Sequence, residues 1–174
     1  PAPQRLEPAR STIQQFIETA AQAVRLFDVN LRQHYFSKDV LESGFRSASI
    51  VKMNEEELPV VAPLLDASAG ETAIAQLIDR FGLDLFVLTR GKLGTKLFSG
   101  AETVEGQPAR FELEKNADSV GAGDACSAAI LHGSVRAWPL QRTADLANQL
   151  GAYVASRSGA TPELPAALLR YWQS

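Results

Sequence analysis

The sequence predicts an α/β fold with a mainly parallel sheet flanked by helices. Short apolar segments at 25–29, 49–53 and 85–89 have the composition of buried strands, and polar residues follow each of them. Segments expected to be helical alternate with these strands, at 37–46 and 71–81. Strands and helices that alternate in this way are joined by right-handed crossovers, which place successive strands parallel to one another.

Capping residues indicate where two of the early helices begin. Ser11 and Gln14 have the spacing of a capping box, in which each side chain satisfies a free amide at the start of a helix. Apolar side chains then recur on one face as far as Val24, so an amphipathic helix is predicted there. Ser37 is predicted to cap the helix at 37–46.

The remainder of the chain is predicted to contain a small edge meander and then helices. Short segments separated by glycine or proline predict antiparallel strands on the sheet edge, at Thr95–Ser99, Thr103–Glu105 and Phe111–Glu114. The final third is expected to form helices from about Gly123 to Arg136, from about Pro139 onward, and over Ala166–Trp172. A chain of 174 residues suits one domain, for which about 100–200 residues are usual.

Composition and charge exclude several classes of protein. Apolar residues make up 45% and charged residues 21% of the chain, as in ordinary soluble proteins, and no run approaches the roughly 18 apolar residues of a membrane span. The formal net charge of -3, without a basic block, argues against nucleic acid or a membrane as a partner. Cys126 is the single cysteine, so no intrachain disulfide or cysteine zinc site forms, and a reducing, cytoplasmic location is expected.

The segment Asn116–Ala129 carries the strongest chemical signal. Gly121, Ala122 and Gly123 leave room for a ligand to approach the backbone, and the helix start that follows offers free amides and the positive end of its dipole. This combination favours an anion such as phosphate. Asp124 falls in the first helical turn, where its carboxylate suits a base that accepts a proton during phosphoryl transfer. The plain alternative is a tight turn in which Asp124 offsets the dipole.

Two other nucleotide signatures are excluded, because the chain has neither a Gly-x-x-x-x-Gly-Lys-Ser/Thr loop nor a Gly-x-Gly-x-x-Gly fingerprint. The segment instead resembles the second signature of the ribokinase-like (PfkB) carbohydrate kinases, Asp-Thr-x-Gly-Ala-Gly-Asp, with Ser119 in place of the usual Thr. Further motifs resemble the same family, at Phe27–Arg32, Val51–Glu57, Leu88–Gly94, and Asn148 with Ser158–Pro165. Phe27–Arg32 looks like the corresponding strand end of the fructokinase or 2-keto-3-deoxygluconate kinase members of this family.

The resemblance implies a role for each matching residue. Asp124 would be the catalytic base, and the Gly121–Gly123 turn would be the anion hole for the transferred phosphoryl group. Asn54 and Glu57 would organise magnesium and phosphate through bound water, so no direct metal site made of protein ligands alone is expected. Their spacing is also that of a helix capping box, and both roles can hold together.

Other matching residues would bind the nucleotide and a cation. The resemblance places six residues beside the nucleotide: Thr89, Gly91, Gly94, Asn148, Gly159 and Ala160. For Asn148, a solvated helix face is the alternative. Asp118 and Ser158 resemble the monovalent-cation site of the family, which usually holds potassium.

Polar residues that follow the first predicted strand form a further candidate site: Asp28, Asn30 and Arg32. They lie at the carboxyl end of a strand, where α/β sheets place their ligands. Asn30 and Arg32 are therefore expected to contact a substrate or phosphate. The alternative is an ion pair that holds the loop.

The resemblance also implies what the chain does and what it lacks. Typical members have a further N-terminal portion with most sugar contacts, a lid and a dimer interface. Residues 1–174 are therefore expected to be a single C-terminal portion of the kinase domain, to which the missing half or another chain would add the rest. The expected activity is ATP- and magnesium-dependent phosphorylation of a sugar or sugar acid, by a homodimer. A non-catalytic nucleotide-binding fragment and a nucleoside or vitamin kinase are the alternatives.

Overall fold

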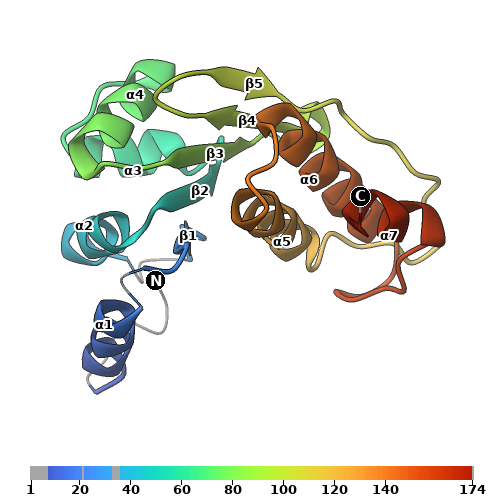
Figure 1. Ribbon diagram of the computed structural model, residues 1–174, viewed down its shortest axis with the longest axis horizontal. Helices are drawn as coiled ribbons and strands as arrows, with labels where there is room; N and C mark the ends of the chain where they lie inside the picture. Colours follow the sequence, from blue (N-terminus) through green and yellow to red (C-terminus); the bar gives the residue numbers. More distant parts are fainter. Residues whose placement is uncertain (1–7, 21, 33–35, 174) are drawn as a thin grey trace. The chain divides into compact units, whose positions relative to one another are not determined.

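Five strands form one sheet in the computed structural model, which describes residues 8–20, 22–32 and 36–173 (Figure 1). Their order along the sheet is their order in the chain: β1 (Leu26–Asp28), β2 (Ile50–Asn54), β3 (Leu85–Thr89), β4 (Thr95–Phe98) and β5 (Thr103–Glu105). The pairs β1–β2 and β2–β3 are parallel, which confirms the predicted α/β class.

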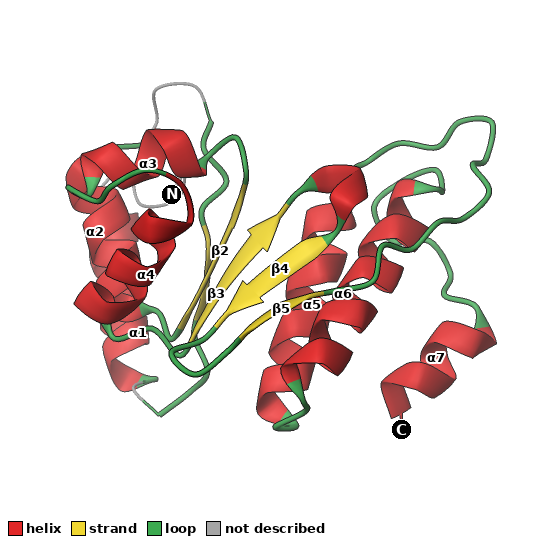
Figure 2. Ribbon diagram, turned by 90° about the horizontal axis from the view of Figure 1, so that it is seen from above, coloured by secondary structure: helices red, strands yellow, loops and turns green. Residues whose placement is uncertain are grey.

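The chain divides into two units. The first unit contains the residues up to Thr89 together with Phe98–Glu102, and the second unit contains Arg90–Leu97 and residues 103–174. Helices cover one face of the parallel strands in the first unit (Figure 2). These helices are α2 (Lys38–Ser47), α3 (Leu58–Leu64) and α4 (Gly70–Phe81).

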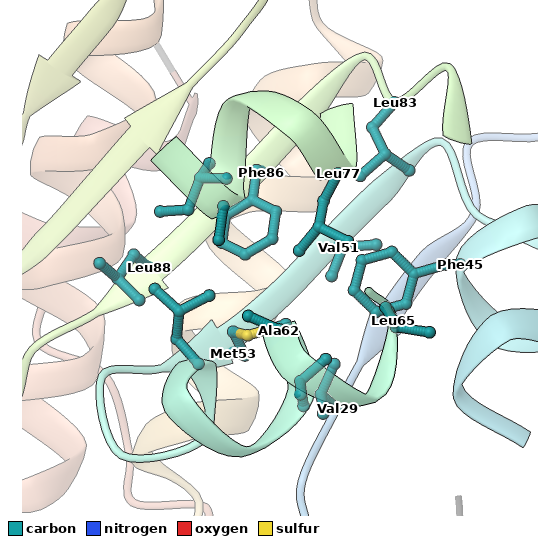
Figure 3. Packing of buried hydrophobic residues seen from close by; sticks show 14 of the residues in the cluster. Val29, Phe45, Val51, Met53, Ala62, Leu65, Leu77, Leu83, Phe86 and Leu88 are labelled. Carbon is teal, nitrogen blue, oxygen red and sulfur yellow. The ribbon is translucent and has the colours of Figure 1, made fainter. Parts of the chain in front are cut away.

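An apolar cluster fills the space between these helices and the strands (Figure 3). Val51 and Met53 of β2 belong to it, because alternate residues of a strand point to the same face. Phe45 of α2 is fully buried and packs against the rings of Phe27 and Phe81, with centroid distances of 6.1 and 5.1 Å. Burying one side chain of this kind stabilises the fold by about 1.5–3 kcal/mol, so this cluster holds the first unit together.

Local signals explain the ends of two helices and one strand. The Ser37 hydroxyl accepts a hydrogen bond from the amide of Val40 (3.3 Å), which confirms Ser37 as the N-cap of α2. Helix α4 ends at Gly82, whose φ of 63° is a left-handed conformation that glycine adopts without steric cost. The strand predicted at 85–89 has the same bounds in the structure.

The predicted capping box at Ser11 and Gln14 is wrong. Helix α1 (Ala9–Thr19) begins before that motif, with Pro8 as its N-cap. The Ser11 hydroxyl lies inside the first turn and donates to the Pro8 carbonyl (2.9 Å), while the Gln14 side chain donates to Glu18 (3.2 Å). Proline is well suited to a helix start because it has no amide hydrogen that needs an acceptor.

The second unit contains the helices of the final third of the chain: α5 (Ala122–Val135), α6 (Leu140–Ala155) and α7 (Ala166–Gln173). They begin close to their predicted starts, and Pro139 is the N-cap of α6. Helices α5 and α6 pack side by side (Figures 1 and 2). Within the described ranges, none of the helices has the length and apolar character needed to cross a membrane.

The predicted edge meander is confirmed for its first two strands. The Ser99 amide donates to the Glu102 carbonyl and the Gly106 amide to the Thr95 carbonyl, both at 2.9 Å. Because the later residue in one strand pairs with the earlier residue in the other, β4 and β5 run antiparallel.

The third predicted strand of the meander, Phe111–Glu114, is wrong, because this segment is irregular. The Glu114 amide donates to the carbonyl of Ser156 just after α6 (3.0 Å), and the Phe111 ring packs edge-on against Tyr153 of α6 (5.3 Å). These contacts hold the segment along α6.

An aromatic cluster attaches α7 to the rest of the second unit. The His132 ring of α5 lies against the ring of Trp172 with a centroid distance of 4.3 Å, and edge-on to Trp138 at 4.9 Å. The Arg142 guanidinium lies over the Trp138 ring, 3.7 Å from its centroid. Stacking and cation–π contacts of this kind add to apolar burial.

We predict that Phe45→Ala lowers the free energy of unfolding by about 3–5 kcal/mol, because it removes a fully buried ring and leaves a cavity. Urea denaturation followed by far-UV circular dichroism measures this. Phe16→Ala is the matched control, since Phe16 is 72% exposed, and it should change stability by less than about 0.5 kcal/mol. Equal effects of the two substitutions would contradict the assignment of the core.

Candidate active site

The turn before α5 is built around Gly121. This residue is the N-cap of the helix and has a φ of 80°, in the left-handed region that glycine adopts freely. A Cβ atom at this position would lie 2.4 Å from the carbonyl oxygen of Ala160. The Ala125 amide donates to the Gly121 carbonyl (2.9 Å), which begins the helical hydrogen bonding. The backbone of this turn therefore requires glycine.

The start of α5 offers backbone donors to an anion. The amides of Gly123 and Asp124 have no acceptor within the helix, because the first amides of a helix lack a carbonyl one turn earlier. The amide of Ala122 donates instead to the Ser119 carbonyl (3.2 Å). Gly123 and Asp124 are exposed, so the turn is open to solvent here. The free amides, the helix dipole and the Asp124 carboxylate thus lie within one turn of helix.

Asp118 connects this turn to the loop after α6. Its Oδ1 accepts the amide of Val120 (2.9 Å), and its Oδ2 accepts the amide of Gly159 (3.1 Å). The Asp118 amide donates to the Arg157 carbonyl (3.0 Å). The structure thus brings together residues that the sequence analysis assigned to the anion hole, the cation site and the nucleotide groove. Ser158, between Arg157 and Gly159, is exposed.

Glu114 and Arg157 strengthen the same connection, and the sequence analysis missed both. Glu114 accepts the amide of Ser158 (3.2 Å) and forms an ion pair with the Arg157 guanidinium (3.4 Å). The guanidinium also donates to the Glu112 carbonyl (2.9 Å) and lies over the Tyr153 ring, 4.5 Å from its centroid. No spacing pattern in the sequence links these residues, because the contacts arise only when the two loops meet.

The predicted nucleotide-side turn is also formed in the second unit. Gly91 (φ 53°) begins the 3-10 turn η2 (Gly91–Leu93), and Gly94 (φ 82°) ends it. A Cβ atom at Gly94 would lie 2.7 Å from Nδ2 of Asn148, so the turn and α6 are in close contact. Asn148 is 6% exposed and donates to the Gln107 carbonyl (3.0 Å). The alternative of a solvated helix face for Asn148 is therefore wrong.

Arg90 holds the same turn against β5. Its guanidinium donates to the Leu93 carbonyl (3.4 Å) and forms an ion pair with Glu105 (3.3 Å). Lys96 also pairs with Glu105, at 3.4 Å. The charge of Arg90, together with hydrogen bonds from Arg90 and Lys96, lowers the pKa of the Glu105 carboxyl from its ordinary value.

Asn54 and Glu57, in the first unit, hydrogen-bond to each other's backbone. The Glu57 amide donates to Oδ1 of Asn54 (2.8 Å), and the Asn54 amide donates to Oε2 of Glu57 (2.9 Å). The reciprocal hydrogen bonds of a capping box are therefore present, but they close the turn before α3, since that helix begins at Leu58 with Glu57 as its N-cap. Oδ1 of Asn54 also accepts the amide of Glu56 (2.9 Å), and Nδ2 of Asn54 has no partner within the described residues.

Glu57 also holds the loop after β1. It is 8% exposed, and its Oε1 accepts the amide of Leu31 (2.7 Å). Leu31 lies between Asn30 and Arg32, which are both exposed. Asp28 at the end of β1 pairs with Lys52 of β2 (2.5 Å), so this ion pair joins two neighbouring strands and is not the loop contact considered from the sequence. Thr89 is at the end of β3 in the same unit. Its hydroxyl oxygen lies 3.5 Å from the carbonyl oxygen of Met53.

Comparison with known proteins decides the family. The sequence profile of the pfkB family carbohydrate kinases matches residues 7–167. The chain belongs to the pfkB family. A fructokinase from Salmonella thompson is 30% identical over 175 residues, which cover 91% of this chain and 75% of that protein.

Solved structures of pfkB-type kinases share the fold. Fructokinase from Vibrio cholerae O395, in its fructose, ADP and calcium ion bound form, matches 98% of this chain with a TM-score of 0.77 and 25% identity. Aminoimidazole riboside kinase from Salmonella enterica, complexed with aminoimidazole riboside and an ATP analog, matches 97% of the chain with a TM-score of 0.77 and 26% identity. The present chain spans 58% of the former and 59% of the latter.

The turn of this pfkB family chain should not tolerate a side chain at Gly121. We predict that Gly121→Ala destabilises the protein clearly more than Gly159→Ala, measured by urea denaturation. Both glycines have left-handed backbone, with φ of 80° and 82°, so both substitutions carry the conformational cost. Only the Cβ at Gly121 would meet another atom within 4 Å. Equal destabilisation would show that the contact with Ala160 does not constrain the turn.

The stabilising effect of the Glu105 ion pairs should depend on pH. Arg90 lowers the pKa of Glu105 in the folded state. The stabilisation is therefore present above the ordinary glutamate pKa of 4.5, and it is lost as pH falls through the lower folded-state pKa. We predict that wild type is more stable than Glu105→Gln at pH 7 and that the difference shrinks below about pH 4.5. Thermal denaturation from pH 7 to pH 3 measures this difference.

Proposed function

We propose that this chain carries the nucleotide- and phosphate-side part of an ATP-dependent kinase that phosphorylates a hydroxyl of a sugar or sugar acid. The start of α5 carries the proposal, because free amides at Gly123 and Asp124 lie in the same helical turn as the Asp124 carboxylate. Membership of the pfkB family and the similarity to a fructokinase support the fructokinase-like assignment.

In the proposed reaction, the Asp124 carboxylate accepts the proton of the acceptor hydroxyl, and the hydroxyl oxygen attacks the γ-phosphorus of ATP. The bond from this phosphorus to the β–γ bridging oxygen breaks, and ADP leaves with the electron pair of that bond. Phosphoryl transfer needs mainly alignment and charge stabilisation. The amides of Gly123 and Asp124 supply the stabilisation, because they have no acceptor within the helix before the anion binds.

In the second unit, the nucleotide is proposed to contact the Gly91–Gly94 turn, Asn148, Gly159 and Ala160. Thr89, at the end of β3 in the first unit, is proposed as a further nucleotide contact. The contacts of Gly94 with the Asn148 side chain and of Gly121 with the Ala160 backbone support this assignment, since they are two places where the chain packs closely. Close packing of this kind suits a flat base and its phosphates, because little side-chain rearrangement is needed.

Magnesium is proposed to bind through the phosphates and water, near Asn54 and Glu57. Within the described residues, no three His, Cys, Asp or Glu side chains group to hold a metal. Glu57 has both carboxylate oxygens engaged by backbone amides, so a water-mediated contact fits it better than direct ligation. When bound, the ion neutralises phosphate charge. A potassium ion is proposed beside the Asp118 carboxylate and the exposed residue Ser158.

The proposal also covers the substrate that accepts the phosphoryl group and the parts of the protein that complete the enzyme. Aminoimidazole riboside kinase matches the chain about as well as fructokinase does, so a nucleoside or vitamin kinase is the second candidate. A non-catalytic nucleotide-binding fragment is the third. We propose that sugar contacts and a dimer interface come from sequence corresponding to the rest of the relatives, with Asn30 and Arg32 as the substrate-side contacts of this chain.

We predict that Asp124→Asn lowers turnover by about 10²–10⁴-fold and leaves ATP affinity within a few-fold of wild type, because the amide cannot accept the proton. ADP release by the protein in its complete form, assayed across sugars, sugar acids and nucleosides, measures turnover. Asp39→Asn is the matched control, since Asp39 is also an acidic residue in a first helical turn. It should leave turnover unchanged.

The outcomes separate the three candidates. Release of ADP with a sugar or sugar acid supports the proposal, and release with nucleosides alone supports the second candidate. ATP binding without turnover on any acceptor supports the non-catalytic fragment. Full activity of Asp124→Asn would remove the aspartate from its role as the base.

A further inference from the structure

The side-chain amide of Asn148 on α6 is held in one orientation. Its Nδ2 donates to the Gln107 carbonyl (3.0 Å), and a carbonyl can only accept, so the nitrogen end of the amide must face Gln107. A Cβ atom on Gly94 would lie 2.7 Å from the same nitrogen, and a Cβ atom on Gly106 would lie 2.6 Å from it. The amide therefore lies in a narrow slot between two glycines, where it has little room to rotate.

The oxygen end of the Asn148 amide stays available to a ligand. Its Oδ1 has no hydrogen-bond partner within the described residues. This oxygen is not a buried atom, because the buried side-chain atoms that lack a partner in the described part of the chain do not include it. An amide oxygen accepts hydrogen bonds and donates none. Asn148 thus offers a fixed acceptor to a ligand that approaches α6 beside the η2 turn.

Further hydrogen bonds keep the Gln107 carbonyl in place. Gln107 lies in an irregular segment after β5, and its amide donates to Oδ1 of Asp145 on α6 (2.7 Å). The same carboxylate oxygen accepts Nε2 of Gln141 (3.0 Å), which also donates to the Glu105 carbonyl (2.9 Å). The Asp145 carboxylate therefore fixes the backbone that in turn orients Asn148. All of these residues belong to the second unit.

A fixed acceptor of this kind suits a nucleotide base that carries an amino group. The exocyclic amino group of adenine is an N–H donor and would satisfy Oδ1 of Asn148. A base without such a donor would take the oxygen out of water and leave it unpaired, which costs more than an ordinary hydrogen bond contributes. A site built to hydrogen-bond one group of a ligand therefore rejects the analogue that lacks this group.

We propose that Asp145 is a positioning residue of the nucleotide site, which acts through the Gln107 backbone to keep the Asn148 oxygen turned to an amino-bearing base such as adenine. The inference rests on the proposed function and adds to it the selection of the base. Asp145 itself does not touch the nucleotide. Its loss therefore lowers the discrimination between bases, whereas a merely structural role predicts equal weakening for every nucleotide.

Isothermal titration calorimetry on the full protein, with ATP and with purine riboside triphosphate, tests this. The two nucleotides differ only in the exocyclic amino group. We expect wild type to bind ATP about fivefold more tightly or better, and Asp145→Ala to reduce this ratio to about twofold or less. Asp145→Asn retains Oδ1 and should keep the ratio. Asp79→Ala, which removes an exposed aspartate of α4, is the matched control and should also keep it.

Each outcome decides the inference. Equal binding of the two nucleotides by wild type overturns it, and so does an Asp145→Ala protein that keeps the wild-type ratio. The proposed function stands in both cases, since ATP still binds. If wild type binds neither nucleotide, the proposed function fails, and the inference fails with it. Where Asp145→Ala does not fold, Gln141→Ala is decisive, because Gln141 is exposed and donates to the same carboxylate. The ratio should then fall in Gln141→Ala, and an unchanged ratio would refute the role of Asp145.

Discussion

The close approach of Gly121 to the Ala160 carbonyl is the constraint on which the phosphate-side site depends. A residue with a Cβ could adopt neither the left-handed backbone nor the short contact without strain. Because the turn passes so close to the loop after α6, the Asp118 carboxylate reaches amides on both segments. Helix α5 then begins with its free amides beside Asp124. The chemistry proposed for the chain follows from this one backbone contact.

Much of the fold could be predicted from the sequence because its signals are local. The strand at 85–89 is an apolar run with polar residues after it, and Ser37 caps α2 through its own side chain. The segment Phe111–Glu114 has the alternation of a strand, but a strand also needs a neighbour with which to pair. The Ser156 carbonyl takes the Glu114 amide instead, so a tertiary contact overrode the local pattern.

The site was harder to predict than the fold because its residues meet through distant contacts. The segment around Asp124 could be recognised, since its small residues and its acid are consecutive. The burial of Asn148 could not, because it depends on the Gln107 carbonyl, far away in the sequence. The pairing of Lys52 with Asp28 depends on the register of β1 against β2, which apolar patterns do not specify.

The aromatic cluster around His132 has a consequence for spectroscopy. Trp138 and Trp172 are the two tryptophans of the sequence, and both lie against the same imidazole in the second unit. Their emission therefore senses the docking of α7 on α5, and it carries no direct signal from the parallel strands. Since far-UV ellipticity sums over all helices, a mismatch between the fluorescence and ellipticity transitions would reveal whether the two units melt separately.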